Sequence, residues 1–190
     1  SSSYQLFYVL SHVYSPIPQK DSAAEAIYQQ FKDIMRSICD DRMSDIQKTR
    51  AIFDWLVVNI YYDNAVAYEP LIYPSYMYDA FYLEGALNGA AVCDVISKAY
   101  SVMCAIEGID CVSVTGKLRD ADENADGHAW NKVHIMGEWF LTDATWGNRV
   151  LGIAEEGQPE VVNRYEYING EYFLFTDYVR YHVDKYNSDQ

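Results

Sequence analysis

Apolar residues recur at helical spacing in two stretches near the start of the chain. In the first, an apolar side chain falls every three or four positions: Ile27, Phe31, Ile34 and Ile38. Ser22 followed by Glu25 precedes this stretch, in the order of a capping box. Ser44 and Gln47 repeat the signature before a second stripe formed by Ile46, Phe53, Leu56 and Ile60. The patterns predict two amphipathic helices.

The middle of the chain changes character twice. Residues 61–82 are rich in Tyr and Pro and are expected to form an ordered loop packed by its own aromatic side chains. A short helical piece should end near residues 85–89. A third main helix is predicted over residues 93–107, because Gly108 then supplies a helix stop.

Strand patterns dominate the second half of the chain. The predicted strands cover residues 111–115, 128–135, 138–145 and 172–176. Met136-Gly137 fits the turn of a hairpin between the two middle strands. Helices first and antiparallel strands later indicate an α+β domain. We expect one domain over residues 1–190, with residues 1–20 as an extended lead-in.

Composition and charge exclude several classes of function. The chain has 190 residues, half of them apolar, which is enough for one buried core. A formal charge of −14 argues against binding nucleic acid or anionic lipid. The sequence has no stretch of about 18 or more uncharged apolar residues, so we expect no insertion into a membrane. The oligomeric state stays open.

The four cysteines are Cys39, Cys93, Cys104 and Cys111. Their spacing fits no zinc site, so we expect free thiols, no metal and no cofactor. Cys93 differs from the others because it opens a predicted helix, where unpaired N–H groups and the helix dipole favour the thiolate. The alternative is that Cys93 is a small buried apolar residue that happens to begin a helix.

The hairpin register places a histidine beside a carboxylate. A two-residue turn pairs Ile135 with Glu138 and sets His128 opposite Thr145. Asp143 then lies on the same face as His128, close enough for the side chains to meet. Such a carboxylate can hold an imidazole in one tautomer. A three-residue loop would put the two side chains on opposite faces.

The remaining histidines are weaker candidates. His12 and His182 lie near the ends of the chain, and His134 lies near the turn, away from Asp143. We expect each of them to be a surface or packing residue.

Three blocks follow one another along the chain: residues 86–94 (ALNGAAVCD), 127–131 (GHAWN) and 137–146 (GEWFLTDATW). In this order they resemble the transglutaminase-like proteins of bacteria. The resemblance implies a papain-like fold, with a helix that carries the nucleophile packed on an antiparallel sheet. It also implies that Cys93 is the nucleophile, His128 the base and Asp143 the residue that orients the base. The expected enzyme is a peptidase or acyltransferase acting on protein or peptide substrates.

Substrate contacts are less well defined by the sequence. Trp130, Tyr82 and Asn88 are candidate substrate-binding residues, although a core position is an equal interpretation for Trp130. Asn88, Tyr76 and Tyr82 are candidates for a side chain that stabilises the oxyanion. The resemblance to exported bacterial relatives implies an extracellular or cell-surface location.

One departure keeps a second hypothesis open. Relatives usually have a Gly-Tyr step after the nucleophile, whereas this chain has Val95-Ile96. Under this second hypothesis the departure accompanies loss of activity, and the chain is a binding domain that uses residues 61–82 as its contact surface. A calcium-dependent crosslinking enzyme is a third option, suggested by the acidic residues 120–126, which lack EF-hand spacing.

Overall fold

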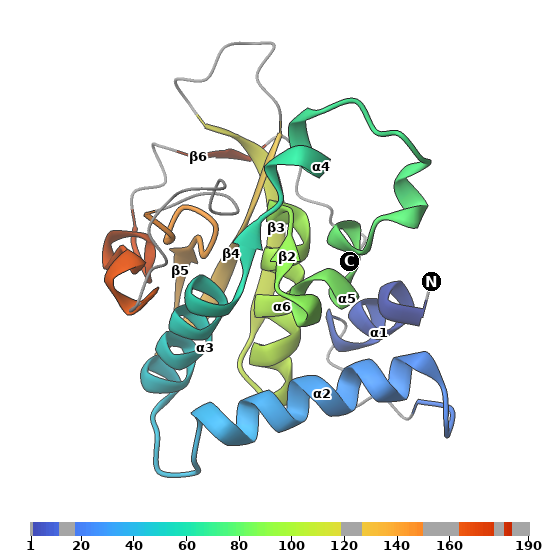
Figure 1. Cartoon of the computed structure of the whole chain (residues 1–190). Coiled ribbons are helices and arrows are strands. Elements are labelled where there is room, and N and C mark those ends of the chain that lie inside the picture. Colours follow the sequence, from blue (N-terminus) through green and yellow to red (C-terminus); the bar gives the residue numbers. More distant parts are fainter. Residues whose placement is uncertain (1, 12–17, 119–126, 150–163, 177–180, 184–190) are drawn as a thin grey trace.

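Most of the helices come before most of the strands along the chain (Figure 1). The computed structural model describes residues 2–11, 18–118, 127–149, 164–176 and 181–183. The helices are α1 (Ser2–Ser11), α2 (Ala23–Ile38), α3 (Asp45–Asn59), α4 (Asn64–Tyr68), α5 (Leu83–Asn88) and α6 (Cys93–Ile106). The strands are β1 (Tyr61–Tyr62), β2 (Ala90–Ala91), β3 (Cys111–Leu118), β4 (His128–Ile135), β5 (Glu138–Thr142) and β6 (Tyr181–Val183).

Helix α6 lies at the centre of the fold. Strands β5, β4, β3 and β6 form an antiparallel sheet in that order, and α6 packs against β3 and β4. Helices α1, α2, α3 and α5 also contact α6 (Figure 1). This arrangement confirms the expected α+β fold, with the helix that begins at Cys93 packed on an antiparallel sheet.

A buried amide ties α6 to the sheet. Asn131 of β4 donates from Nδ2 to the carbonyl oxygen of Ser97 at 2.9 Å and to Oγ of Ser101 at 3.0 Å, both on α6. Because Asn131 is buried, these bonds are shielded from competing water. They fix the strand that begins at His128 against the helix that begins at Cys93.

Both capping signatures occur where the sequence predicts them. The Ser22 hydroxyl accepts from the Glu25 N–H at the start of α2, and Ser44 and Gln47 form a complete capping box before α3. The predicted stripe of α3 is wrong at one position. Ile46 is exposed, and Thr49 is buried with its hydroxyl bonded to carbonyl oxygens of the preceding turn.

The expected extended lead-in is wrong for residues 2–11, which form α1. Leu6, Phe7 and Leu10 share one helical face and are buried in the main core. Their burial against α2 and α6 stabilises this helix. Residues 12–17 of the lead-in lie outside the described residues.

Residues 61–82 are more regular and more exposed than predicted. They contain β1, α4 and two short 3-10 helices, Ser75–Met77 and Asp79–Phe81. Strand β1 pairs in parallel with β2, setting Tyr61 beside Ala90 and Tyr62 beside Ala91. Several aromatic side chains of the segment, among them Tyr73 and Tyr76, are exposed to solvent, although the rings of Tyr62 and Tyr68 contact each other.

The hairpin forms with the predicted register, Ile135 pairing with Glu138 across Met136-Gly137. Both turn residues have positive φ, +53° and +86°, as a tight hairpin turn requires. Strand β5 ends at Thr142, three residues before the predicted end.

The predicted strand over residues 172–176 is reduced to one bridge, between Leu141 and Phe175. A 3-10 helix, Gly170–Tyr172, occupies its start. The acidic residues 120–126 lie outside the described residues. Within the described part of the chain, no helix is long and apolar enough to cross a bilayer.

Candidate active site

Cys93 is the first residue of α6, and its thiol is half-buried. The N-cap, Val92, has a side chain that cannot accept a hydrogen bond, so the first N–H groups of α6 keep their positive potential. Gly89 ends α5 with φ +89°, and Gly85 packs so closely on the backbone that an added Cβ would lie 2.4 Å from the Asp79 carbonyl oxygen. These two glycines allow the tight backbone turn that leads from α5 to Cys93.

His128 begins β4, and Asp143 directly follows β5. Nε2 of His128 lies 2.7 Å from Oδ2 of Asp143. Oδ1 of Asp143 accepts the backbone N–H of Trp146 at 3.0 Å, so each carboxylate oxygen has its own donor. Asp143 is 0% exposed. The hairpin therefore brings the predicted pair together, as the register requires.

Two tryptophans enclose the imidazole. The ring of Trp130 stacks on His128 with centroids 5.9 Å apart and an interplanar angle of 25°. Trp146 meets the same imidazole edge-on, also at 5.9 Å. The His128 side chain is 12% exposed as a result. This apolar enclosure strengthens the charge interaction between His128 and Asp143.

The Cys93 sulfur and His128 are joined by a hydrogen bond. Because Nε2 faces Asp143, Nδ1 is the nitrogen left for the sulfur. Burial lowers the pKa of His128, but the charge and hydrogen bond of Asp143 and the contact with Cys93 outweigh it and raise that pKa to about 9. The geometry favours an imidazolium.

The thiol responds in the opposite direction. Burial raises the pKa of Cys93, but the hydrogen bond and charge of His128, the Ala129 N–H and the Tyr62 hydroxyl together lower it. Burial raises the pKa of Cys39 to about 11 and that of Cys104 well above its usual value. All four cysteines are free thiols, as predicted. Of the described cysteines, Cys93 has the surroundings of a nucleophile.

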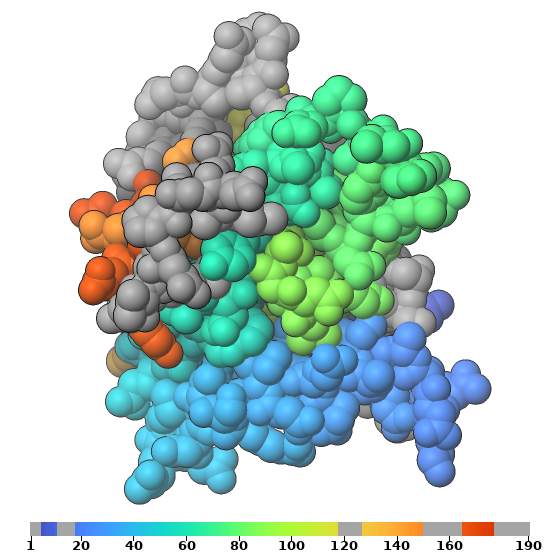
Figure 2. Space-filling model, viewed as in Figure 1, coloured from blue at the N-terminus to red at the C-terminus, as the bar shows by residue number. Residues whose placement is uncertain are grey.

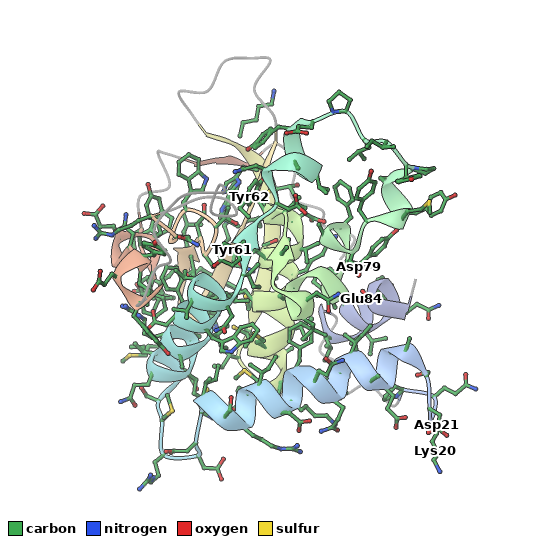
Figure 3. The ribbon with its side chains drawn as sticks, viewed as in Figure 1. Lys20, Asp21, Tyr61, Tyr62, Asp79 and Glu84 are labelled. Carbon is green, nitrogen blue, oxygen red and sulfur yellow. The ribbon has the colours of Figure 1, made fainter. Side chains whose placement is uncertain are left out.

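Tyr62 is a site residue that the sequence analysis missed. Its hydroxyl hydrogen-bonds to Cys93, and its ring lies 6.2 Å from that of Tyr68. Burial raises the pKa of Tyr62, so the hydroxyl stays protonated and donates. Figure 3 shows Tyr62 on the short strand that follows α3. Tyr62 lies within residues 61–82, which the sequence predicts as an aromatic loop, and that pattern did not indicate this contact.

The predicted substrate-binding residues occupy different surroundings. Trp130 is 1% exposed, which supports the core and shielding interpretation. Tyr82 is half-buried before α5, and Asn88 is exposed and donates to Oδ2 of Asp79 at 3.1 Å. Tyr76 is exposed on a 3-10 helix. A role of Trp130, Tyr82 or Asn88 in binding substrate stays a prediction.

Val95 and Ile96 belong to the main hydrophobic core, where both are buried. The departure from the Gly-Tyr step therefore adds apolar packing within α6. His134 lies 3.6 Å from the Asp110 carboxylate, away from Cys93 along β4. The described residues contain no group of three His, Cys, Asp or Glu side chains suited to a metal ion.

The sequence matches proteins from animals over most of its length. It is 25% identical over 152 residues to the human kyphoscoliosis peptidase, covering 76% of this chain and 21% of that protein. It is 26% identical over 166 residues to Hillarin of Drosophila melanogaster, covering 80% of this chain and 19% of that protein. The chain thus spans about a fifth of the length of these relatives. A bacterial origin stays a prediction.

The fold has a counterpart among solved structures. A crystal structure described as a TGase superposes with a TM-score of 0.56 at 16% identity, over 83% of this chain and 41% of the other. The family model of the transglutaminase-like superfamily matches residues 32–144, which include Cys93, His128 and Asp143. Because that match covers more than half of the sequence, the chain belongs to the transglutaminase-like superfamily.

Proposed function

We propose that this chain is a thiol enzyme that cleaves or transfers the acyl group of peptide or carboxamide bonds. The observation that carries the proposal is the hydrogen-bonded series from buried Asp143 through His128 to Cys93. A lowered thiol pKa beside a raised imidazole pKa favours the thiolate–imidazolium pair used by cysteine nucleophiles. The family supports a protein or peptide substrate.

In the proposed reaction, the Cys93 thiolate attacks the carbonyl carbon and forms a C–S bond. The N–H groups at the start of α6 stabilise the oxyanion. The C–N bond breaks as His128 gives its proton to the leaving amine, and a thioester remains. Water or an acceptor amine then transfers a proton to His128 and attacks the thioester. The C–S bond breaks, and the thiolate is regenerated.

Alkylation by iodoacetamide as a function of pH, read by peptide mapping, tests the proposal. Wild-type Cys93 should react well below the free thiol pKa of about 8.5. His128→Ala should remove that advantage. His134→Ala is the matched control, because His134 also lies on β4 beside a carboxylate, and it should react like the wild type. A Cys93 that titrates as a free cysteine in the wild type would overturn the enzyme proposal.

The exposed aromatic side chains of residues 61–82 favour a second candidate, a binding domain without catalysis. Under this alternative, Cys93 reacts no faster than free cysteine, while the domain still binds a protein through that segment. The alkylation profile therefore separates the two candidates before any substrate is known.

A further inference from the structure

Exposed apolar side chains gather in one short segment. Six of the thirteen large apolar side chains that are exposed in the described residues lie within residues 68–77, here called the apolar segment: Tyr68, Leu71, Ile72, Tyr73, Tyr76 and Met77. Ile72 is 85% exposed and Tyr76 is 70% exposed. Figure 2 shows the segment at the surface, in teal to green. Patches of this kind on soluble proteins mark binding sites.

The apolar segment begins beside the nucleophile. Tyr62 hydrogen-bonds to Cys93, and its ring lies 6.2 Å from the ring of Tyr68, the last residue of α4. Asp63 caps α4 by accepting the Val66 N–H at 3.0 Å, which fixes α4 directly after β1. A polypeptide whose carbonyl group reached Cys93 would therefore have this surface within reach of its flanking residues.

The sequence on both sides of the apolar segment is acidic. Residues 51–97 contain no Lys, Arg or His, and their six carboxylates are Asp54, Asp63, Glu69, Asp79, Glu84 and Asp94. Asp54 pairs with Arg50 and Asp94 with Lys98. Among the described ion pairs, none involves the other four carboxylates. Figure 3 shows Asp79 and Glu84 near each other, beyond the end of the segment.

We propose that the apolar segment is the docking surface for the protein substrate, and that it selects stretches in which aliphatic or aromatic side chains alternate with Lys or Arg. This inference rests on the proposed function. The exposed aliphatic and tyrosine side chains bury the apolar residues of the substrate. The tyrosine faces and the carboxylates Glu69 and Asp79 attract its cations.

Binding is measured by fluorescence anisotropy on a Cys93→Ala protein, so that no turnover intervenes. The probes are fluorescein-labelled peptides with one central Gln. It is flanked by Leu, Phe and Arg in one probe, by Leu, Phe and Glu in the second, and by Ser and Arg in the third. The first peptide should bind about tenfold more tightly than either of the others. Equal affinity for all three would overturn the proposal.

Paired substitutions then locate the surface. Ile72→Ser with Tyr76→Ser should weaken binding of the first peptide about tenfold, because both side chains are exposed anchors. The control pair is Met136→Asn with Tyr165→Ser, which removes equally exposed apolar side chains elsewhere and should leave binding unchanged. Glu69→Gln should weaken binding and its salt dependence, whereas Glu138→Gln on the hairpin should not.

The outcomes separate this inference from the proposed function. If the peptides bind as expected while Cys93 alkylates like free cysteine, the docking proposal is supported and the enzyme proposal is overturned. If Cys93 is activated but the Ile72→Ser, Tyr76→Ser protein binds normally, the docking proposal fails and catalysis stands. Sedimentation gives a further test. A wild-type dimer that this double substitution dissociates would assign the surface to a second copy of the chain and overturn the proposal.

Discussion

Asp143 is the residue on which the geometry of the candidate site depends most. It is fully buried, and its two carboxylate oxygens accept from two donors, His128 Nε2 and the Trp146 backbone N–H. An asparagine offers only one acceptor oxygen at the same position, so one donor would face an NH2 group. The charge that raises the pKa of His128 would also be lost.

Asp143→Asn should therefore weaken both stability and reactivity. A buried donor without an acceptor costs about 1–3 kcal/mol, measurable as a lower urea midpoint. At about pH 6, alkylation of Cys93 should slow at least about tenfold, because the thiolate loses its imidazolium partner. Asp110 lies next to His134, and its side chain is 60% exposed. Asp110→Asn should therefore change stability by less than about 0.5 kcal/mol. An equal loss in both variants would contradict the role of burial.

At the scale of elements, the sequence predicts best where the signal is local. The capping residues Ser22 and Ser44 and the turn Met136-Gly137 determine their own conformations, and all three occur as expected. The contact between His128 and Asp143 was predictable for the same reason, because side-chain parity in a hairpin follows from the length of its turn.

Elements that depend on distant partners were not predictable. Strands β1 and β2 have two residues each and exist because they pair with each other. Strand β6 pairs with β3 from more than 60 positions along the chain. The contact of Tyr62 with Cys93 depends on the β1–β2 pairing, so no pattern around Tyr62 could reveal it. Helix α1 likewise forms because its apolar face is covered by other helices.

The turn after β5 sets the position of Asp143 and tolerates little change. The Gly147 N–H donates to the Asp143 carbonyl oxygen at 2.8 Å. A Cβ added at Gly147 would lie 2.3 Å from the ring of Phe53 and 3.0 Å from that carbonyl oxygen. Phe53 is a fully buried core residue whose ring also contacts Phe173, so it has little room to move.

Gly147→Ala should lower the free energy of unfolding by about 1–3 kcal/mol, the usual cost of overpacking a core. It should also slow Cys93 alkylation, because the turn that carries Asp143 must shift. Gly170→Ala is the control, since its added Cβ would meet nothing closer than an Arg50 nitrogen at 3.6 Å. Urea unfolding of both variants decides the matter. A Gly147→Ala protein as stable as the control would contradict this prediction, because it would show that the Phe53 ring can move to accommodate the added methyl group.

At the scale of the whole molecule, the candidate site should affect how stability depends on pH. A pKa of His128 raised to about 9 contributes stability that is fully present below about pH 6.5 and is lost as the pH rises through 9. The lowered pKa of Cys93 contributes stability that is present above the unfolded thiol pKa of about 8.5 and is lost as the pH falls through its folded value.

These two effects oppose each other between about pH 7 and pH 8. In this range His128 takes up a proton on folding, whereas the lowered pKa of Cys93 favours release of a proton from the thiol. The thiol therefore offsets part of the slope that His128 imposes on the stability of the wild type. Removing the thiol leaves the contribution of His128 alone, because the charge and hydrogen bond of Asp143 still favour the imidazolium.

Cys93→Ser should therefore lose stability relative to the wild type as the pH rises from 7 to 8, by up to about 1.4 kcal/mol per pH unit. The other ionisable groups are common to both proteins, so the difference between their urea midpoints isolates the pair. Adding His128→Ala to Cys93→Ser should remove this additional slope, because no group of the pair is then left to take up the proton. Parallel pH profiles for Cys93→Ser and the wild type would contradict the prediction, because they would mean that removing the thiol leaves proton uptake on folding unchanged in this range.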